Sequence, residues 1–163
     1  MGCHKGRFLV ETALRCPASN FLGVERQRER VERAKRKIAL HGIGNAEVLH
    51  GDGLEIIRRL PDACADCVHV LFPDPWPKRR HKIRRMVGGK FLVEVLRILK
   101  VRGLVRLVTD DAEYARAMES HAAGIAAYQR TENDLGNYPL TEFQIKFLAD
   151  SRPVYGLAFE RLN

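Results

Sequence analysis

Short apolar runs alternate with helical patterns along this 163-residue chain, and four of the runs end in a carboxylate. The four acids are Glu25, Asp52, Asp74 and Asp110. The alternation predicts an α/β fold with a mainly parallel sheet and helices on both faces. Because the carboxyl ends of parallel strands meet at one edge, where such folds bind ligands, the four acids are expected at one site. Capping of the next helix is the competing role for Asp110 or Asp111.

The periodicity of apolar residues predicts the individual elements. Helices are expected at residues 7–15, 27–41, 54–60, 90–100, 111–124 and 141–148. Strands are expected at 20–25, 46–52, 66–72, 104–110, 127–132 and 154–161, the last one antiparallel. A turn is expected at 101–103 and a loop at 133–140. Since no repeat or low-complexity segment divides the chain, residues 1–163 are expected to form a single domain.

The segment from Phe72 to Arg85 joins an apolar strand to a cationic loop. Three of the seven prolines lie in it, and each fixes its own φ and lacks an N–H donor. Asp74 and Trp76 are therefore predicted in a stiff, non-helical stretch. The basic residues that follow account for most of the net charge of +8: Lys78, Arg79, Arg80, Lys82, Arg84, Arg85 and Lys90. Such a local cluster favours nucleic acid or another polyanion over a merely solvated basic face.

Other classes of protein and site are disfavoured. The Cys64–Cys67 pair has the spacing of half a zinc site, but no second pair completes it, so no metal is expected. The first residues lack the apolar region of a signal peptide. No apolar run is long enough to span a membrane. These features predict a cytoplasmic protein with reduced thiols.

The start of the chain has features of a nucleoside site. Glu25 lies 19 residues after Gly6, a spacing at which an acid reaches a ribose in dinucleotide-type sites. No phosphate-binding lysine motif is present, which favours a nucleoside without a triphosphate.

The motif FPDPWPKRRHKIRR at 72–85, together with Thr109-Asp110 and Thr141-Glu142-Phe143, resembles the bacterial tRNA (guanine-N7)-methyltransferases. The resemblance covers essentially the whole chain. It implies a Rossmann-like class I fold, S-adenosyl-L-methionine as cofactor, and methylation of N7 of a guanine in the tRNA variable loop. N7 carries an available lone pair, so positioning and electrostatics can suffice for the transfer.

The resemblance also implies roles for individual residues. Asp74 would be the catalytic residue, near the methionyl end and the guanine. Cofactor positions would be Gly2, Gly6, Glu25, Asp52 and Asp74. Substrate positions would be Lys78, Asp110, Thr141, Glu142, Phe143 and Gln144, the last of which replaces the Glu of many members. RNA contacts would be Arg80, His81, Lys82, Arg84 and Arg85. Trp76 either stacks on a base or packs the proline loop.

Two departures from the family concern the cofactor half. Family members carry a strand ending in Glu-Ile-Gly before the glycine turn, whereas this chain begins at Met1-Gly2. The sequence therefore predicts a domain truncated at its N-terminus, with a sheet lacking its first, central strand. His4 also replaces a glycine. Because unpaired backbone groups are costly, we expect either direct pairing of the flanking strands or marginal stability.

Three functions follow from these observations. The favoured one is a monomeric tRNA guanine-N7 methyltransferase. The alternative is an RNA-binding module of the same fold that is catalytically weak or inactive. A methyltransferase for another substrate is disfavoured, because Asp74 is followed by Pro-Trp and a cationic loop, not by the Pro-Pro-aromatic pattern of amino-directed enzymes.

Overall fold

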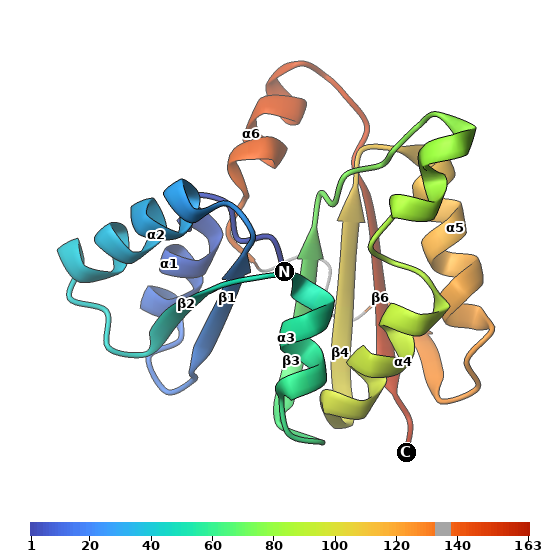
Figure 1. The fold of residues 1–163 in the computed structure, drawn as a ribbon, viewed down its shortest axis with the longest axis horizontal. Helices are drawn as coiled ribbons and strands as arrows, with labels where there is room; N and C mark the ends of the chain where they lie inside the picture. Colours follow the sequence, from blue (N-terminus) through green and yellow to red (C-terminus); the bar gives the residue numbers. More distant parts are fainter. Residues whose placement is uncertain (133–137) are drawn as a thin grey trace.

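The computed structural model describes residues 1–132 and 138–163 and shows an α/β chain with two sheets (Figure 1). The smaller sheet pairs β1 (Phe21–Glu25) and β2 (Ala46–His50) in parallel. The larger sheet has the order β3-β4-β6-β5. Its strands are β3 (Ala65–Leu71), β4 (Leu99–Thr109), β5 (Tyr128–Thr131) and β6 (Tyr155–Arg161). β3 and β4 are parallel, and β6 is antiparallel to β4 and β5, as predicted for the last strand.

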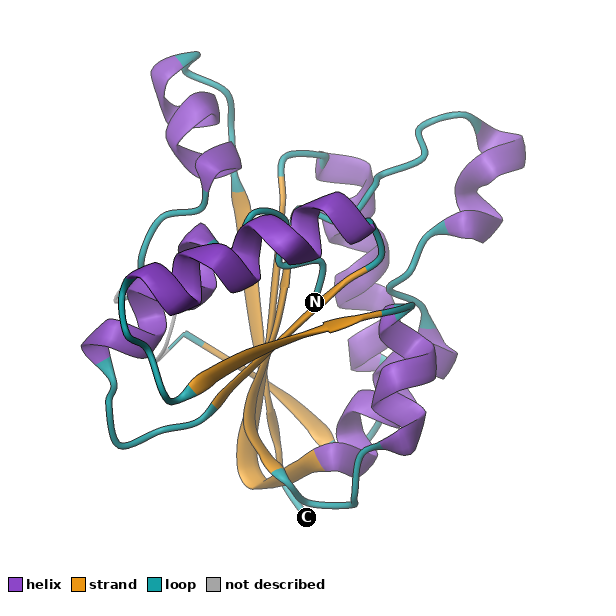
Figure 2. Cartoon of the chain, turned by 60° about the vertical axis from the view of Figure 1, so that its left-hand side comes forward, coloured by secondary structure: helices purple, strands orange, loops and turns teal. Residues whose placement is uncertain are grey.

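Helices lie on both sides of the strands (Figure 2). They are α1 (Arg7–Arg15), α2 (Arg28–Leu40), α3 (Gly53–Arg59), α4 (Gly89–Ile98), α5 (Ala112–Ala123) and α6 (Glu142–Ala149). A 3-10 helix that the sequence did not predict, η1 (Arg79–Arg84), lies within the cationic segment. All six predicted α-helices and six predicted strands are present. Residues 133–137 of the predicted loop lie outside the described residues.

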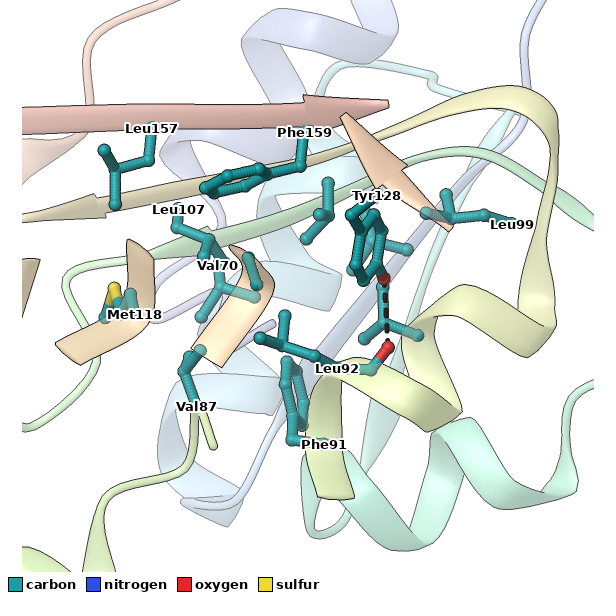
Figure 3. Close-up of a cluster of buried hydrophobic side chains, with 14 of the residues drawn as sticks. Val70, Val87, Phe91, Leu92, Leu99, Leu107, Met118, Tyr128, Leu157 and Phe159 are labelled. Carbon is teal, nitrogen blue, oxygen red and sulfur yellow. Dashed lines mark hydrogen bonds between the residues drawn. The ribbon is translucent and has the colours of Figure 1, made fainter. Parts of the chain in front are cut away.

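Two apolar cores correspond to the two sheets. The larger core packs α4 and α5 against β3 and β4, with Phe91, Leu92, Val70 and Leu107 all at most 1% exposed (Figure 3). The Tyr128 hydroxyl donates to the Leu92 carbonyl oxygen at 3.0 Å, which satisfies a buried polar group. A smaller core joins α1 and α2 to β1 and β2 through Leu9, Val31, Ala34 and Val48.

The predicted turn at 101–103 is wrong. α4 ends at Ile98, and β4 begins directly at Leu99. The start of β4 is irregular, because its pairing with β3 shifts register between Ala65 and Cys67. A Cβ on Gly103 would lie 2.7 Å from the Lys100 carbonyl oxygen. The glycine therefore permits a bend inside a strand, where the sequence pattern suggested a break between elements.

The predicted interruption of the sheet is confirmed. Within the described residues no hydrogen-bonded ladder joins β1 to β3, so the flanking strands do not pair directly. A cavity of about 520 Å³ lies between them, lined by apolar side chains such as Leu22, Val24 and Val68. At its carboxyl end the Cys3 N–H donates to Val24 O at 2.9 Å, and the Met1 amino group donates to His69 O.

Amide hydrogen exchange can test this interruption. Residues alternate along a strand, so Leu22, Val24 and His69 direct their backbone groups into the gap, whereas Gly23 faces β2 and Val70 faces β4. We expect the amides of the first three to exchange about tenfold faster or more than those of the last two, which must open a ladder first. Equal protection of alternate residues would contradict an open gap.

Candidate active site

The acids at the strand ends take different positions. Glu25 is the last residue of β1 and only 5% exposed, whereas Asp52 and Asp74 are exposed after β2 and β3. Asp52 caps α3 by accepting from Leu54 N at 2.9 Å. Asp111, and not Asp110, caps α5, because its Oδ1 accepts from Tyr114 N at 2.6 Å. Asp110 instead pairs with Arg152 and remains at the end of β4.

Glu25 holds the glycine turn against β1. Its Oε2 accepts from the His4 N–H at 2.9 Å, and its Oε1 accepts from Arg26 N and Gln27 N, each at 2.9 Å. A carboxylate has about four acceptor positions, so three are occupied and capacity for about one further donor remains. The ribose position implied by the sequence therefore also has a structural task, which the spacing of residues did not reveal.

The glycine turn combines close packing with open space. Gly2, His4 and Gly6 have φ values of 69°, 53° and 79°, in the region that favours glycine. A Cβ on Gly6 would lie 2.8 Å from the Ala34 Cβ, so Gly6 serves the packing of the turn on α2. A Cβ on Gly2 would meet nothing within 4 Å. Of the two predicted cofactor glycines, Gly2 is the one that borders unfilled space.

The proline loop presents Asp74 and Trp76 beyond β3. Residues 73–77 have no regular secondary structure, and Phe72 and Trp76 have φ values of 52° and 43°. The Trp76 ring packs edge-on against His81 at 5.8 Å and lies 5.2 Å from the Arg84 guanidinium. Trp76 is thus part of the packing of the loop.

The predicted RNA-contacting residues divide into two groups. Arg85 has only 8% of its side chain exposed, donates to Pro75 O at 2.7 Å and pairs with Glu113. Lys82 also pairs with Glu113, at 2.6 Å. The second group, Arg80 and Arg84, is exposed, as are Lys78 and Arg79 beside it. His81, which packs on Trp76, belongs to neither group.

α6 lies beyond the carboxyl ends of β1 and β3 (Figure 1). Thr141 caps it as predicted, with Gln144 completing a capping box: Thr141 Oγ1 accepts from Gln144 N at 3.0 Å. Gln serves this box as Glu does. Glu142 lies 3.1 Å from His4 Nδ1, and the Phe143 ring is 6.0 Å from that of Phe72. The predicted substrate segment therefore joins the glycine turn and the start of the proline loop.

His69 lies below the site and was not singled out by the sequence. Its ring is 5.1 Å from Phe8 and 4.8 Å from Tyr138, and its Nδ1 is 3.3 Å from Arg106 Nη1. Burial, reinforced by the positive charge of Arg106, lowers the pKa of His69 to about 3. A histidine inside an apolar strand pattern was the available signal. Among the described residues no cluster of three or more His, Cys, Asp or Glu side chains could hold a metal.

Comparisons with known proteins agree on one family. A family model described as a putative methyltransferase matches residues 1–157. A Shewanella amazonensis protein named tRNA (guanine-N(7)-)-methyltransferase is 34% identical over 171 residues, which cover 100% of this chain and 71% of that protein. A Nitrosococcus oceani protein of the same name is 31% identical over 164 residues, covering 99% and 70%.

The chain belongs to the tRNA (guanine-N(7)-)-methyltransferase family. The resemblance carried by residues 72–85 is therefore confirmed.

Solved structures support the fold expected of this family. Precorrin-6y C5,15-methyltransferase from Geobacter metallireducens matches with a TM-score of 0.69 and 13% identity, over 100% of this chain and 77% of that one. An rRNA methylase from Streptococcus thermophilus matches with a TM-score of 0.62 and 16% identity, over 99% and 83%. The class I methyltransferase fold is thus confirmed. No helix of the described residues is long and apolar enough to cross a membrane.

The pKa of His69 generates a prediction for stability. An unfolded chain binds a proton at His69 below about pH 6.5, whereas the folded chain does so only near pH 3. Stability from the neutral histidine is therefore present above pH 6.5 and is lost as the pH falls toward 3. Between pH 7 and 5 we expect the free energy of urea unfolding to fall by up to about 2 kcal/mol.

Two variants test whether His69 causes this dependence of the unfolding free energy on pH. His69→Gln should flatten it, while His121→Gln, at an exposed position, should leave it unchanged. Identical slopes for the wild type and His69→Gln would show that His69 is not buried in its neutral form.

Proposed function

We propose that this chain transfers a methyl group from S-adenosyl-L-methionine to N7 of a guanine in the variable loop of tRNA. One observation carries the proposal. At the carboxyl edge, Asp74 begins an exposed cationic segment after β3, while Glu25 anchors a glycine turn on β1, across the cavity. The substrate and cofactor halves that the family requires therefore lie at the same edge. A tRNA substrate implies a cytoplasmic enzyme, and we retain the expectation that it is a monomer.

The residues present suit the cofactor. Glu25 keeps acceptor capacity for a ribose hydroxyl, and the exposed carboxylate of Asp52 suits the adenine side. The space beside Gly2 admits a ligand where a side chain would intrude. S-adenosylmethionine supplies a methyl group already activated by the sulfonium. The protein then has to hold the two reactants in line.

Asp74 is the residue assigned to the reaction itself. With the cofactor bound, the N7 lone pair would form the new C–N bond as the C–S bond breaks and its electron pair goes to sulfur. Positive charge would thereby pass from sulfur to guanine. The exposed carboxylate of Asp74 can accept from guanine N1–H and the exocyclic amino group, and it stabilises the arriving charge. No general base is needed, because N7 carries no proton.

The exposed cations supply affinity for the tRNA backbone. Arg79, Arg80 and Arg84 belong to η1, none of whose residues is buried, and Lys78 immediately precedes it. Cations of this kind bind phosphates with little dependence on sequence and with strong dependence on salt. Selection of the guanine is then left to Asp74 and to the segment that begins α6.

Replacement of Asp74 tests the catalytic assignment. In Asp74→Asn we expect the rate of methyl transfer to fall by about a hundredfold or more, with tRNA affinity nearly unchanged. The readout is mass spectrometry of nucleosides from tRNA treated with the labelled cofactor. Asp66→Asn, at an exposed position on β3, is the matched control. Label at a position other than guanine N7, or tRNA binding by the wild type without transfer, would refute the proposal.

The basic segment has a separate test. Replacing Arg79, Arg80 and Arg84 with Ala should weaken tRNA binding and lower the slope of log K against log salt by roughly 1 for each arginine that binds a phosphate. The control removes the same charge from the exposed face of α2, at Arg33, Lys35 and Arg36. Equal slopes for the two triple variants would show that η1 does not bind the RNA.

A further inference from the structure

The loop that presents Asp74 has few backbone donors with which to hold its own conformation. Pro73, Pro75 and Pro77 have no N–H to donate, and residues 73–77 form no helix or strand. Phe72 and Trp76 have left-handed φ values of 52° and 43°, which cost energy for side chains of this size. Contacts from outside the loop must therefore hold its geometry.

Arg85 supplies one such contact. Its Nε donates to the Pro75 carbonyl oxygen at 2.7 Å, one residue after Asp74. Only 8% of its side chain is exposed, although its neighbour Arg84 is exposed. The Arg85 guanidinium also lies 4.6 Å from the Tyr114 ring centroid. Arg85 thus points inward, toward α5.

Glu113 fixes that arginine from the first turn of α5. Its two carboxylate oxygens accept from Nη1 and Nη2 of Arg85 at 3.0 and 3.4 Å, and Lys82 Nζ lies 2.6 Å from Oε2. A two-point contact restricts the orientation of the guanidinium as well as its position. An acid in the first turn is also favoured by the helix dipole. These pairings lower the pKa of Glu113 to about 2.

A neighbouring contact ties the far end of the segment to the same helix. The Val87 N–H donates to the hydroxyl of fully buried Tyr114 at 3.0 Å. Figure 1 shows the η1 segment beside α5, which begins at Ala112, two residues after Asp110 at the end of β4. α5 therefore connects the loop that carries Asp74 to the end of β4, where the predicted substrate residue Asp110 lies.

We propose that Glu113 and Arg85 are positioning residues that hold the Asp74 loop in its reactive geometry. Resting on the proposed function, this assigns Arg85 to the loop and not to the RNA backbone. Loss of the Arg85 contact would free Pro75 and displace the neighbouring Asp74 carboxylate. In-line transfer is sensitive to displacements of about 1 Å, so the rate would fall. Glu113 also neutralises the charges of Lys82 and Arg85. The exposed arginines of η1 then remain available to bind RNA phosphates.

The test uses the full chain with Glu113→Gln, which keeps the side-chain shape and removes the charge. Glu119→Gln is the matched control, because Glu119 is an acid on the same helix that pairs with Arg130 of β5. We expect Glu113→Gln to lower kcat about tenfold or more, while the KM for tRNA stays equal or falls because Lys82 and Arg85 lose their counter-ion. Arg85→Lys should lower kcat likewise, since an ammonium cannot reproduce the fork.

A second readout needs neither cofactor nor tRNA. Trp76 is the single tryptophan of the chain and lies in this loop, so its fluorescence anisotropy reports the order of the loop. The anisotropy should fall in Glu113→Gln and Arg85→Lys and stay at the wild-type value in Glu119→Gln. Glu113→Asp, which keeps the charge, should retain part of both kcat and anisotropy.

Either of two results would overturn the proposal. Unchanged kcat with a lower KM would show that Glu113 only adjusts the charge that RNA encounters. Unchanged Trp76 anisotropy would show that the loop is ordered without the pair. If the wild type makes no N7-methylguanine, the proposed function fails, and the anisotropy still decides whether Glu113 and Arg85 order the loop.

Discussion

The two sheets of this chain are joined at their carboxyl edge by the backbone of its first four residues. Met1 donates to His69 O on β3, Cys3 N donates to Val24 O on β1, and His4 N donates to the Glu25 carboxylate. No ladder joins β1 to β3 in the described part of the chain. This short bridge therefore helps to align the two sheets, together with α6, which contacts it through Glu142 and His4, and with the Phe8 ring of α1, which packs on His69 of β3.

One acid, Glu113, pairs with part of the positive charge in the cationic segment after β3. Glu113 pairs with Lys82 and Arg85, which separates these two cations from the exposed Arg79, Arg80 and Arg84 of η1. Without an internal counter-ion, close cations would repel one another and the proline loop would have no fixed partner. A cluster that looks uniform along the chain thus divides into cations that pair with Glu113 and cations that are exposed on η1.

Much of the fold followed from periodicity, because buried faces repeat at the period of the element that carries them. The apolar positions of α4 and the antiparallel β6 are examples. The start of β4 did not follow: Gly103 suggests a turn at 101–103, but β4 begins at Leu99, which pairs with Ala65, and continues through 101–103 across a register shift. The 3-10 helix was also missed, because prolines and repeated cations give no helical periodicity.

The sequence by itself determined the family, the order of the elements and the placing of Glu25, Asp52, Asp74 and Asp110 at strand ends, since these depend on local pattern and on a specific motif. Only the tertiary structure decided which of these groups have other partners. It placed Asp111 and not Asp110 as the cap of α5, three backbone N–H groups on Glu25, and Arg85 on Pro75 and Glu113. The physical reason is that the direction of a side chain depends on neighbours that are distant in sequence. Glu113 lies 28 residues from Arg85, and no local pattern records their contact.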